Sequence, residues 1–218
     1  EDFSLTSARK GEQKMKTVLH QANTRGHANH GWLNSYHTFS FAQYYNPERV
    51  HFGMLRVLND DTVSGSMGFG THPHDNMEIT GIYHSEKNFH KDKEVKFLQI
   101  WMFPNKKDVT PRYDQITLDA DKNHNAWQQV LSPNADDEGV WVHQNAWFSM
   151  TKLDAGKSLD YRVKGKGNGL YYFILEGEVE VDGQKLGKRD GFGVWETSHS
   201  KLTASSNAEV LLMEVPMN

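Results

Sequence analysis

The second half of the chain alternates apolar and polar residues in short runs that predict β-strands. An apolar run over residues 170–175 leads into a strict Glu-Val-Glu-Val alternation that ends at Val181. Asp182 and Gly183 follow, a dipeptide that favours the tight turn of a β-hairpin. Runs at 191–195 and 209–215 predict two more strands. Short strands at spacings of roughly ten residues favour a β-sandwich or β-barrel.

The first half predicts strands less regularly. Residues 16–20 and 55–59 predict short strands, the second of them ended by turn-forming Asp60 and Asp61. Residues 95–103 are mostly apolar on both faces and predict a strand buried on both sides. Residues 25–41 lack a period and predict irregular structure that leads into a short strand. We therefore predict an all-β chain of two tandem barrels with few short helices.

Composition narrows the class of protein. The 218-residue chain has a formal charge of −4, which leaves no basic excess for binding nucleic acid. It has no cysteine, which excludes disulfides and thiolate metal sites and fits a cytoplasmic protein. No apolar run is long enough to span a membrane. Residues 1–14 are polar and precede a Met that looks like a natural start, so we expect them to be a tail outside the fold.

The densest group of potential ligands lies in and just after the segment 68–78. His72 and His74 are two residues apart, and Glu78 is a further even step along. Residues at i and i+2 of a strand share a face, so these side chains could converge on one metal ion. His84, from a neighbouring strand, could complete a nitrogen and oxygen set suited to Fe(II), and also to Cu, Ni, Mn or Zn. The alternative is that both histidines are ordinary polar loop residues beside Pro73.

The remaining histidines show no such spacing. His27, His30 and His37 fall in the aperiodic segment, and we interpret them as surface or hydrogen-bonding residues rather than ligands. In the second half His143 and His199 are isolated. We therefore expect the second barrel to be free of metal.

Several motifs together resemble the pirin family of the cupin superfamily. They are Thr-His-Pro-His at 71–74 with Glu78, Thr-Gly-Ile-Tyr-His-Ser-Glu at 80–86, Phe-Leu-Gln-Ile-Trp at 97–101, His-Thr-Phe-Ser-Phe at 37–41 and Leu-Glu-Gly-Glu-Val at 175–179. The resemblance covers the chain from Met15 onward. It implies an N-terminal metal-binding cupin domain at 15–120 and a C-terminal cupin domain without metal ligands at 121–218. The polar, proline-containing stretch from 105 to about 122 is the expected connection between them.

The resemblance also implies a site and an activity. Carried over residue by residue, the metal ligands are His72, His74, His84 and Glu86, so that Glu86 replaces Glu78, which becomes a supporting residue. The implied activity is a metal-dependent, quercetinase-type dioxygenase that opens flavonols such as quercetin, with Fe(II) as the expected metal and Glu86 as the catalytic carboxylate. The partners would be a flat aromatic substrate and dioxygen, without nucleic acid or membrane. The alternative is a non-enzymatic, metal-dependent regulator that binds other proteins.

One departure from the family pattern bears on this site. Family members carry a substantial insert between the two ligand motifs, whereas Ile79 here runs directly into Thr80. A tight turn at Thr80 and Gly81 would oppose Met77 to His84 and leave His84 out of register with His74. We therefore predict that a segment between Ile79 and Thr80 is missing. An intact mass equal to the sequence value of 25.0 kDa would contradict this prediction.

Overall fold

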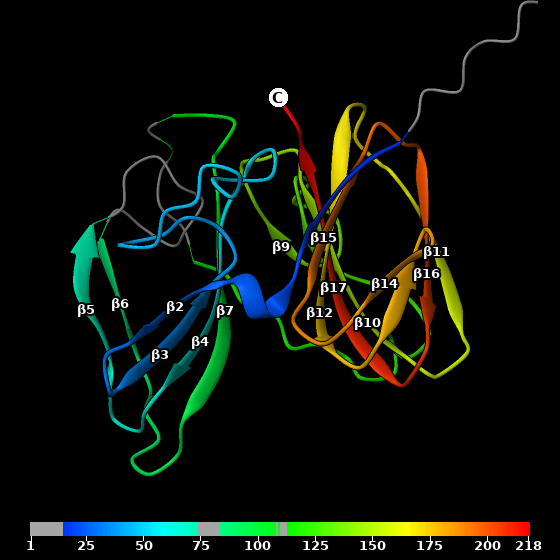
Figure 1. Ribbon diagram of the computed structural model, residues 1–218. Coiled ribbons are helices and arrows are strands. Elements are labelled where there is room, and N and C mark those ends of the chain that lie inside the picture. Colours follow the sequence, from blue (N-terminus) through cyan, green and yellow to red (C-terminus); the bar gives the residue numbers. More distant parts are fainter. Residues whose placement is uncertain (1–14, 74–82, 108, 110–112) are drawn as a thin grey trace, which may run out of the picture.

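The computed structural model describes residues 15–73, 83–107, 109 and 113–218; among these, the side chains of 71–73 and 83–86 are not described. The described residues form two bodies of β-sheet that lie side by side, joined by the short 3-10 helix η1 (Ala22–Thr24) (Figure 1). The chain is nearly all β, as predicted. No helix in the described ranges is long and apolar enough to cross a membrane.

The body formed mainly by the second half consists of two sheets. The larger has the order β1 (Lys16–His20), β15 (Gly191–Trp195), β12 (Asn168–Glu176), β17 (Ala208–Pro216), β10 (Trp147–Leu153), β8 (Gln128–Ser132) and β9 (Val140–Trp141). The smaller has the order β11 (Ser158–Arg162), β16 (His199–Ala204), β13 (Val179–Val181) and β14 (Gln184–Leu186). Apolar side chains such as Tyr172, Val181 and Leu202 fill the space between these sheets and are fully buried.

The hairpin predicted at Asp182 and Gly183 is confirmed. It joins β13 to β14, and Val181 lies opposite Gln184. Asp182 has φ +48° and Gly183 has φ +88°, the two positive values that a mirror-image hairpin turn requires. Because this signal is local, the residues themselves were sufficient to predict it.

The body formed by the first half has a four-stranded sheet in the order β2 (Gly26–Asn29), β3 (Leu33–His37), β4 (Leu55–Val63) and β7 (Val95–Met102). A separate hairpin of β5 (Gly68–Pro73) and β6 (Tyr83–Lys87) lies beside it (Figure 1). The domain boundaries at 15–120 and 121–218 stay a prediction. The two bodies do not correspond strictly to the two halves of the chain, because β1 of the first half pairs with β15 in the large sheet.

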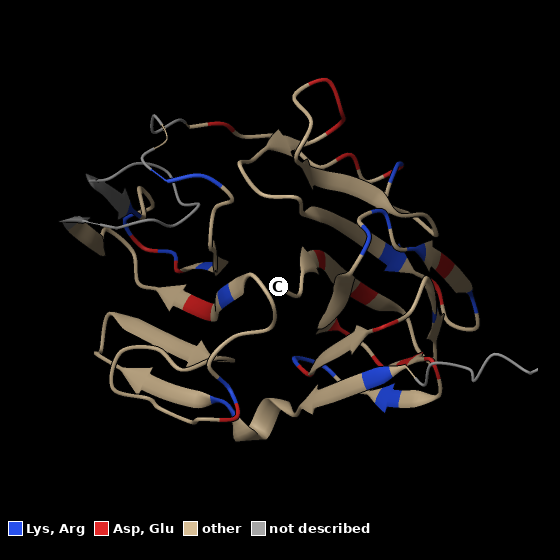
Figure 2. Ribbon diagram, turned by 90° about the horizontal axis from the view of Figure 1, so that it is seen from above, with Lys and Arg blue, Asp and Glu red and all other residues tan. Residues whose placement is uncertain are grey.

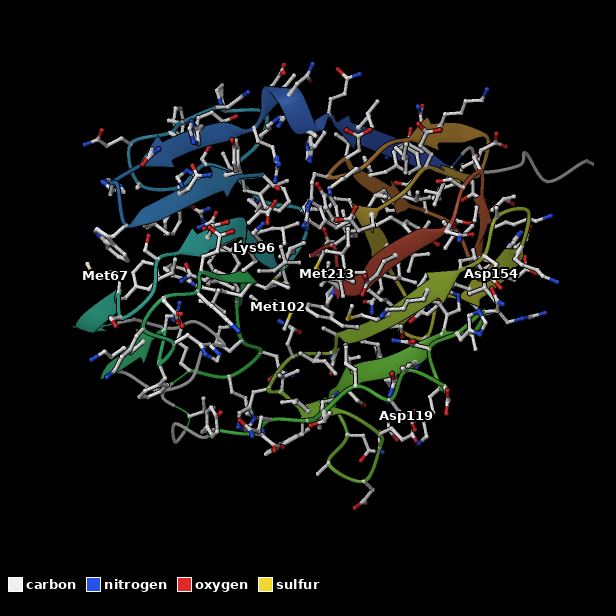
Figure 3. All side chains as sticks on the ribbon, turned by 90° about the horizontal axis from the view of Figure 1, so that it is seen from below. Met67, Lys96, Met102, Asp119, Asp154 and Met213 are labelled. Atoms are coloured by element: carbon white, nitrogen blue, oxygen red, sulfur yellow. The ribbon has the colours of Figure 1, made fainter. Side chains whose placement is uncertain are left out.

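A shared apolar core holds the two bodies together. Phe39, Phe52 and Met102 of the first half pack into one buried cluster with Tyr171 and Met213 of the second. Met102 and Met213 lie near each other at the centre of Figure 3. Burial of this many apolar side chains fixes the position of the first body on the second.

Three sequence predictions for the first half were wrong. Residues 26–37, predicted to be largely irregular, form the hairpin of β2 and β3, whose turn contains Gly31 at φ +80°. The strand predicted to end at Asp60 and Asp61 continues as β4 to Val63, because both aspartates find partners: Arg25 for Asp60 and Ser35 for Asp61. Strand β7 is mostly half-buried rather than buried on both sides, because it lies at the edge of its sheet.

Candidate metal and substrate site

The hairpin of β5 and β6 brings the two ligand motifs into register. His72 lies directly opposite His84, and Phe69 lies opposite Glu86. The register differs from the tight-turn pairing considered above, in which Met77 would oppose His84. His74 and Glu78 lie outside the described residues, as do the side chains of His72, His84 and Glu86. The ligand set implied by the resemblance therefore stays a prediction.

The pairing of β5 with β6 shifts its register between Phe69 and His72. His72 is the third residue after Phe69 on β5, whereas Glu86 is the second residue after His84 on β6. The pairing therefore contains one extra residue of β5 between the pair of Phe69 with Glu86 and the pair of His72 with His84.

A cavity of about 410 Å³ lies between β5 and the four-stranded sheet. Phe69 contributes to the lining together with Gly68 and Gly70 of β5. At Gly70 an added Cβ would meet no atom within 4 Å. Phe69, the register partner of Glu86, is thus a residue of the cavity wall.

Aromatic side chains form two walls of the cavity. Trp32 meets Phe69 edge to face, with ring centroids 5.3 Å apart and planes at 72°. Phe41 meets Trp101 in the same way, at 5.3 Å and 81°. Rings in this arrangement are rigid and present flat apolar surface, which suits a planar aromatic ligand.

The floor of the cavity is polar and belongs to the sheet. Ser35 of β3 lies opposite Asp61 of β4, and in the next polar row His37, Asn59 and Gln99 lie opposite one another on β3, β4 and β7. The Ser35 hydroxyl donates to Asp61 Oδ1 at 2.5 Å. The floor therefore offers hydrogen-bonding groups between aromatic walls.

The sequence prediction did not include this floor. The sequence does carry a signal for this floor, because polar residues recur at every second position: Ser35 with His37, and Asn59 with Asp61. The sequence by itself predicts irregular structure for the first pair, whereas it predicts the end of a strand at Asn59 and a turn at Asp61. The correct prediction from this pattern is two strands whose polar residues, at every second position, face a cavity.

The histidines of the first hairpin divide into different environments. The Nε2 atom of His27 lies 2.6 Å from Asn34 Oδ1, and its ring stacks on Tyr36 at 4.5 Å. His30 lines the cavity. His37 is buried, and burial lowers its pKa, as do His27 and His30. Its Nδ1 and the Oδ1 of Asn59 have no hydrogen-bond partner among the described residues.

Charged groups elsewhere in the described part of the chain do not form an alternative metal site. Among the residues whose side chains the structure describes, no three His, Asp or Glu side chains gather closely enough to hold a metal ion. Lysines and arginines are interspersed with aspartates and glutamates along both bodies (Figure 2). The predicted set of three imidazoles and one carboxylate fits a divalent first-row metal, because it combines nitrogen and oxygen donors without sulfur.

Comparisons with known proteins identify the family of this chain. The Pirin family model matches residues 18–80, and the model described as the quercetinase C-terminal cupin domain matches residues 129–215. A protein of Escherichia coli K12 named quercetin 2,3-dioxygenase is 36% identical over 230 residues, covering 91% of this chain and 98% of its own. A pirin-like protein of Caulobacter vibrioides is 29% identical, covering 87% of this chain and 95% of its own.

The alignment with the Escherichia coli protein is longer than the matched part of this chain. Its 230 positions include about 198 residues of this chain, which is 91% of 218. About 30 positions of the alignment therefore lie opposite gaps in this chain. The match to the Pirin model ends at residue 80, next to the predicted gap after Ile79.

A solved structure gives the same result. The crystal structure of the bacterial pirin YhhW from Escherichia coli in complex with nickel(II) is 34% identical, covers 92% of this chain and 99% of its own, and superposes with a TM-score of 0.85. Similarity at this level extends over both bodies of the fold. The chain is a cupin-type protein and belongs to the pirin family.

Proposed function

We propose that this pirin is a metal-dependent dioxygenase that opens flavonols such as quercetin. The observation that carries the proposal is the register of β5 and β6, in which His72 opposes His84 and Glu86 opposes Phe69 of the cavity wall. The names of relatives such as the Escherichia coli quercetin 2,3-dioxygenase support the same chemistry.

In this proposal His72, His74, His84 and Glu86 hold one divalent metal ion, and we expect Fe(II). A divalent ion held there would supply Lewis-acid polarisation of substrate oxygen atoms. The rings of Trp32, Phe69, Phe41 and Trp101 would hold a flat substrate between them and exclude water from it. Glu86 would take the proton of a substrate hydroxyl, as a carboxylate close to that group can.

The test compares quercetin consumption by wild-type protein and by His84→Ala, both loaded with Fe(II) and supplied with air. We expect His84→Ala to lose bound iron and to lower kcat/KM by more than about 100-fold, since even an outer-shell partner of a metal ligand contributes 10–100-fold. His199→Ala is the matched control, because His199 is an exposed histidine of the second half.

Three outcomes would contradict the proposal. Equal consumption of quercetin by wild type and His84→Ala would remove the enzymatic function at this site. Full retention of iron by His84→Ala would remove His84 from the ligand set. A wild-type protein that binds iron without consuming quercetin would instead favour the non-enzymatic, protein-binding alternative.

A further inference from the structure

Two side chains on the floor of the cavity are buried and make no hydrogen bond to any residue that the structure describes. They are His37 of β3, which is 3% exposed, and Asn59 of β4, which is 1% exposed, and both line the cavity. They lie directly opposite each other on the paired strands, so their side chains share a face, with Cβ atoms about 4.5–5.5 Å apart. Buried polar groups in proteins are nearly always hydrogen-bonded, so this pair requires a partner from outside the described chain.

The inaccessible atoms of the pair decide which atoms a ligand meets. Nδ1 of His37 and Oδ1 of Asn59 are closed off and have no hydrogen-bond partner among the described residues. The remaining polar atoms, His37 Nε2 and Asn59 Nδ2, are not closed off in this way. Because both residues line the cavity, these two nitrogen atoms are the ones presented to its contents.

Both nitrogen atoms are hydrogen-bond donors. Burial lowers the pKa of His37, so at neutral pH its ring is uncharged and carries one hydrogen. On Nδ1 this hydrogen would form a buried N–H group without an acceptor, which is rarer in proteins than a buried acceptor without a donor. The hydrogen is therefore on Nε2. The same reason keeps the NH₂ group of Asn59 toward the cavity, since the flipped amide would close off two N–H groups.

We propose that His37 and Asn59 are specificity-determining residues whose Nε2–H and Nδ2–H groups donate to one carbonyl oxygen of a flat aromatic substrate. The inference rests on the proposed function, because it takes this cavity to be the substrate site. Flavonols carry a carbonyl group on their fused rings, and the aromatic walls of the cavity suit those rings. A ligand of the same shape without the carbonyl would leave both donors unpaired, which disfavours that ligand.

The chain offers a matched control on the same strand as His37. Asn34 lies three residues before His37 on β3, so its side chain points to the opposite face of the sheet. Its Oδ1 lies 2.6 Å from Nε2 of His27, and neither of these residues lines the cavity. Asn34→Leu therefore removes an amide from the same sheet without changing the cavity floor.

The test measures the binding of xanthone and xanthene, three-ring ligands that differ only in a carbonyl group, by equilibrium dialysis of the metal-bound protein under nitrogen. We expect wild type to bind xanthone at least about 10-fold more tightly than xanthene, because two neutral hydrogen bonds have roughly that effect. Asn59→Leu keeps the volume and loses the donor, so this preference should fall by about 3–5-fold while xanthene affinity stays within about 3-fold. Asn34→Leu should keep the wild-type preference. Any contribution of the metal ion to xanthone binding is common to these proteins and cancels in the comparison.

Other results would overturn the assignment. These are a wild type without preference, an Asn59→Leu variant that keeps the wild-type preference or weakens both ligands equally, and an Asn34→Leu variant that loses the preference as well. If Asn59→Leu does not fold, as judged by its thermal melting curve, His37→Phe replaces it. Phenylalanine keeps a ring against Phe41, whose centroid lies 5.1 Å from that of His37, but it has no nitrogen. The preference should again fall by about 3–5-fold, and an unchanged preference overturns the inference.

Failure of this inference is distinguishable from failure of the proposed function. Wild type that selects xanthone through Asn59 but does not consume quercetin in air would refute the dioxygenase and leave the carbonyl-binding role intact. Wild type that consumes quercetin while Asn59→Leu keeps its binding preference would do the reverse.

Discussion

His20 should make the fold acid-sensitive. The side chain is 4% exposed in β1, and its Nδ1 lies 2.7 Å from the Tyr171 hydroxyl. Its Nε2 is buried and has no hydrogen-bond partner in the described part of the chain. Burial, together with the nearby positive charge of Arg49, lowers the pKa of His20 from 6.5 to about 4. Protonation would place an extra charge in this closed space, so the fold requires the neutral ring.

The size of the effect follows from the difference between folded and unfolded chains. In the unfolded chain His20 binds a proton below about pH 6.5. Between that pH and about 4 the unfolded chain binds more protons than the folded one, so the free energy of unfolding falls as the pH falls. At about 1.4 kcal/mol per pH unit, the loss is about 2 kcal/mol between pH 7 and pH 5 and about 3 kcal/mol below pH 4.

Urea unfolding of wild type and His20→Gln at pH 7 and pH 5, with EDTA in every sample, measures this loss. Glutamine does not titrate, so His20→Gln should lose about 2 kcal/mol less than wild type between the two pH values. The other ionisable groups, including buried His37, contribute to both proteins and cancel in the comparison. Coincident fluorescence and circular-dichroism transitions check that unfolding is two-state. Equal losses in the two proteins would refute the reasoning.

Three further predictions concern two buried, hydrogen-bonded side chains and one closely packed glycine. Glu214 is fully buried and accepts hydrogen bonds from the Tyr161 hydroxyl, the Lys164 and Gly165 amides and Asn168 Nδ2. Glu214→Gln should therefore lower the free energy of unfolding, measured in urea, by about 2–4 kcal/mol. Glu209→Gln on the same strand is the control and should change it by under about 0.5 kcal/mol. Asn88 Nδ2 donates to the carbonyls of Val63, Ser64 and Lys93. Asn88→Ala should therefore lower the free energy of unfolding, measured by thermal melting, by about 2–3 kcal/mol. Phe89 has an exposed side chain (89%), so an equal loss in Phe89→Ala would contradict this role of Asn88. An added Cβ at Gly193 would lie 2.4 Å from the Phe52 ring. Gly193→Ala should therefore lower the melting temperature by an amount equivalent to about 1–3 kcal/mol. Gly187→Ala is the control, because an added Cβ there would lie 3.8 Å from its nearest atom.

Local signals in the sequence predicted much of the second body. The run at 170–175, the Glu-Val alternation and the Asp-Gly turn all lie within about fifteen residues, and the structure contains β12, β13 and β14 there. Such signals succeed because a hairpin pairs residues that are close in sequence, and its turn depends on the φ values that two residues can adopt.

The first body was harder to predict, because its polar residues are stabilised by partners far away in the chain. Asp60 and Asp61 favour a turn by themselves, yet Arg25 and Ser35 pair with them and keep β4 extended to Val63. Likewise β1 predicts a strand from its own residues, but nothing in those residues indicates that it pairs with β15. Partners 26 to about 175 residues away decide both outcomes.

The same division applies to the candidate site. The sequence by itself determined the motifs: two histidines at i and i+2 in 72–74, and a histidine and a glutamate at i and i+2 in 84–86, because strand geometry puts each pair on one face. Only the tertiary structure decided that His72 opposes His84 and that Phe69 opposes Glu86, since register is a property of two strands. The cavity floor of Ser35 and Asp61 also required the fold, because it exists only where β3 and β4 lie side by side opposite that hairpin.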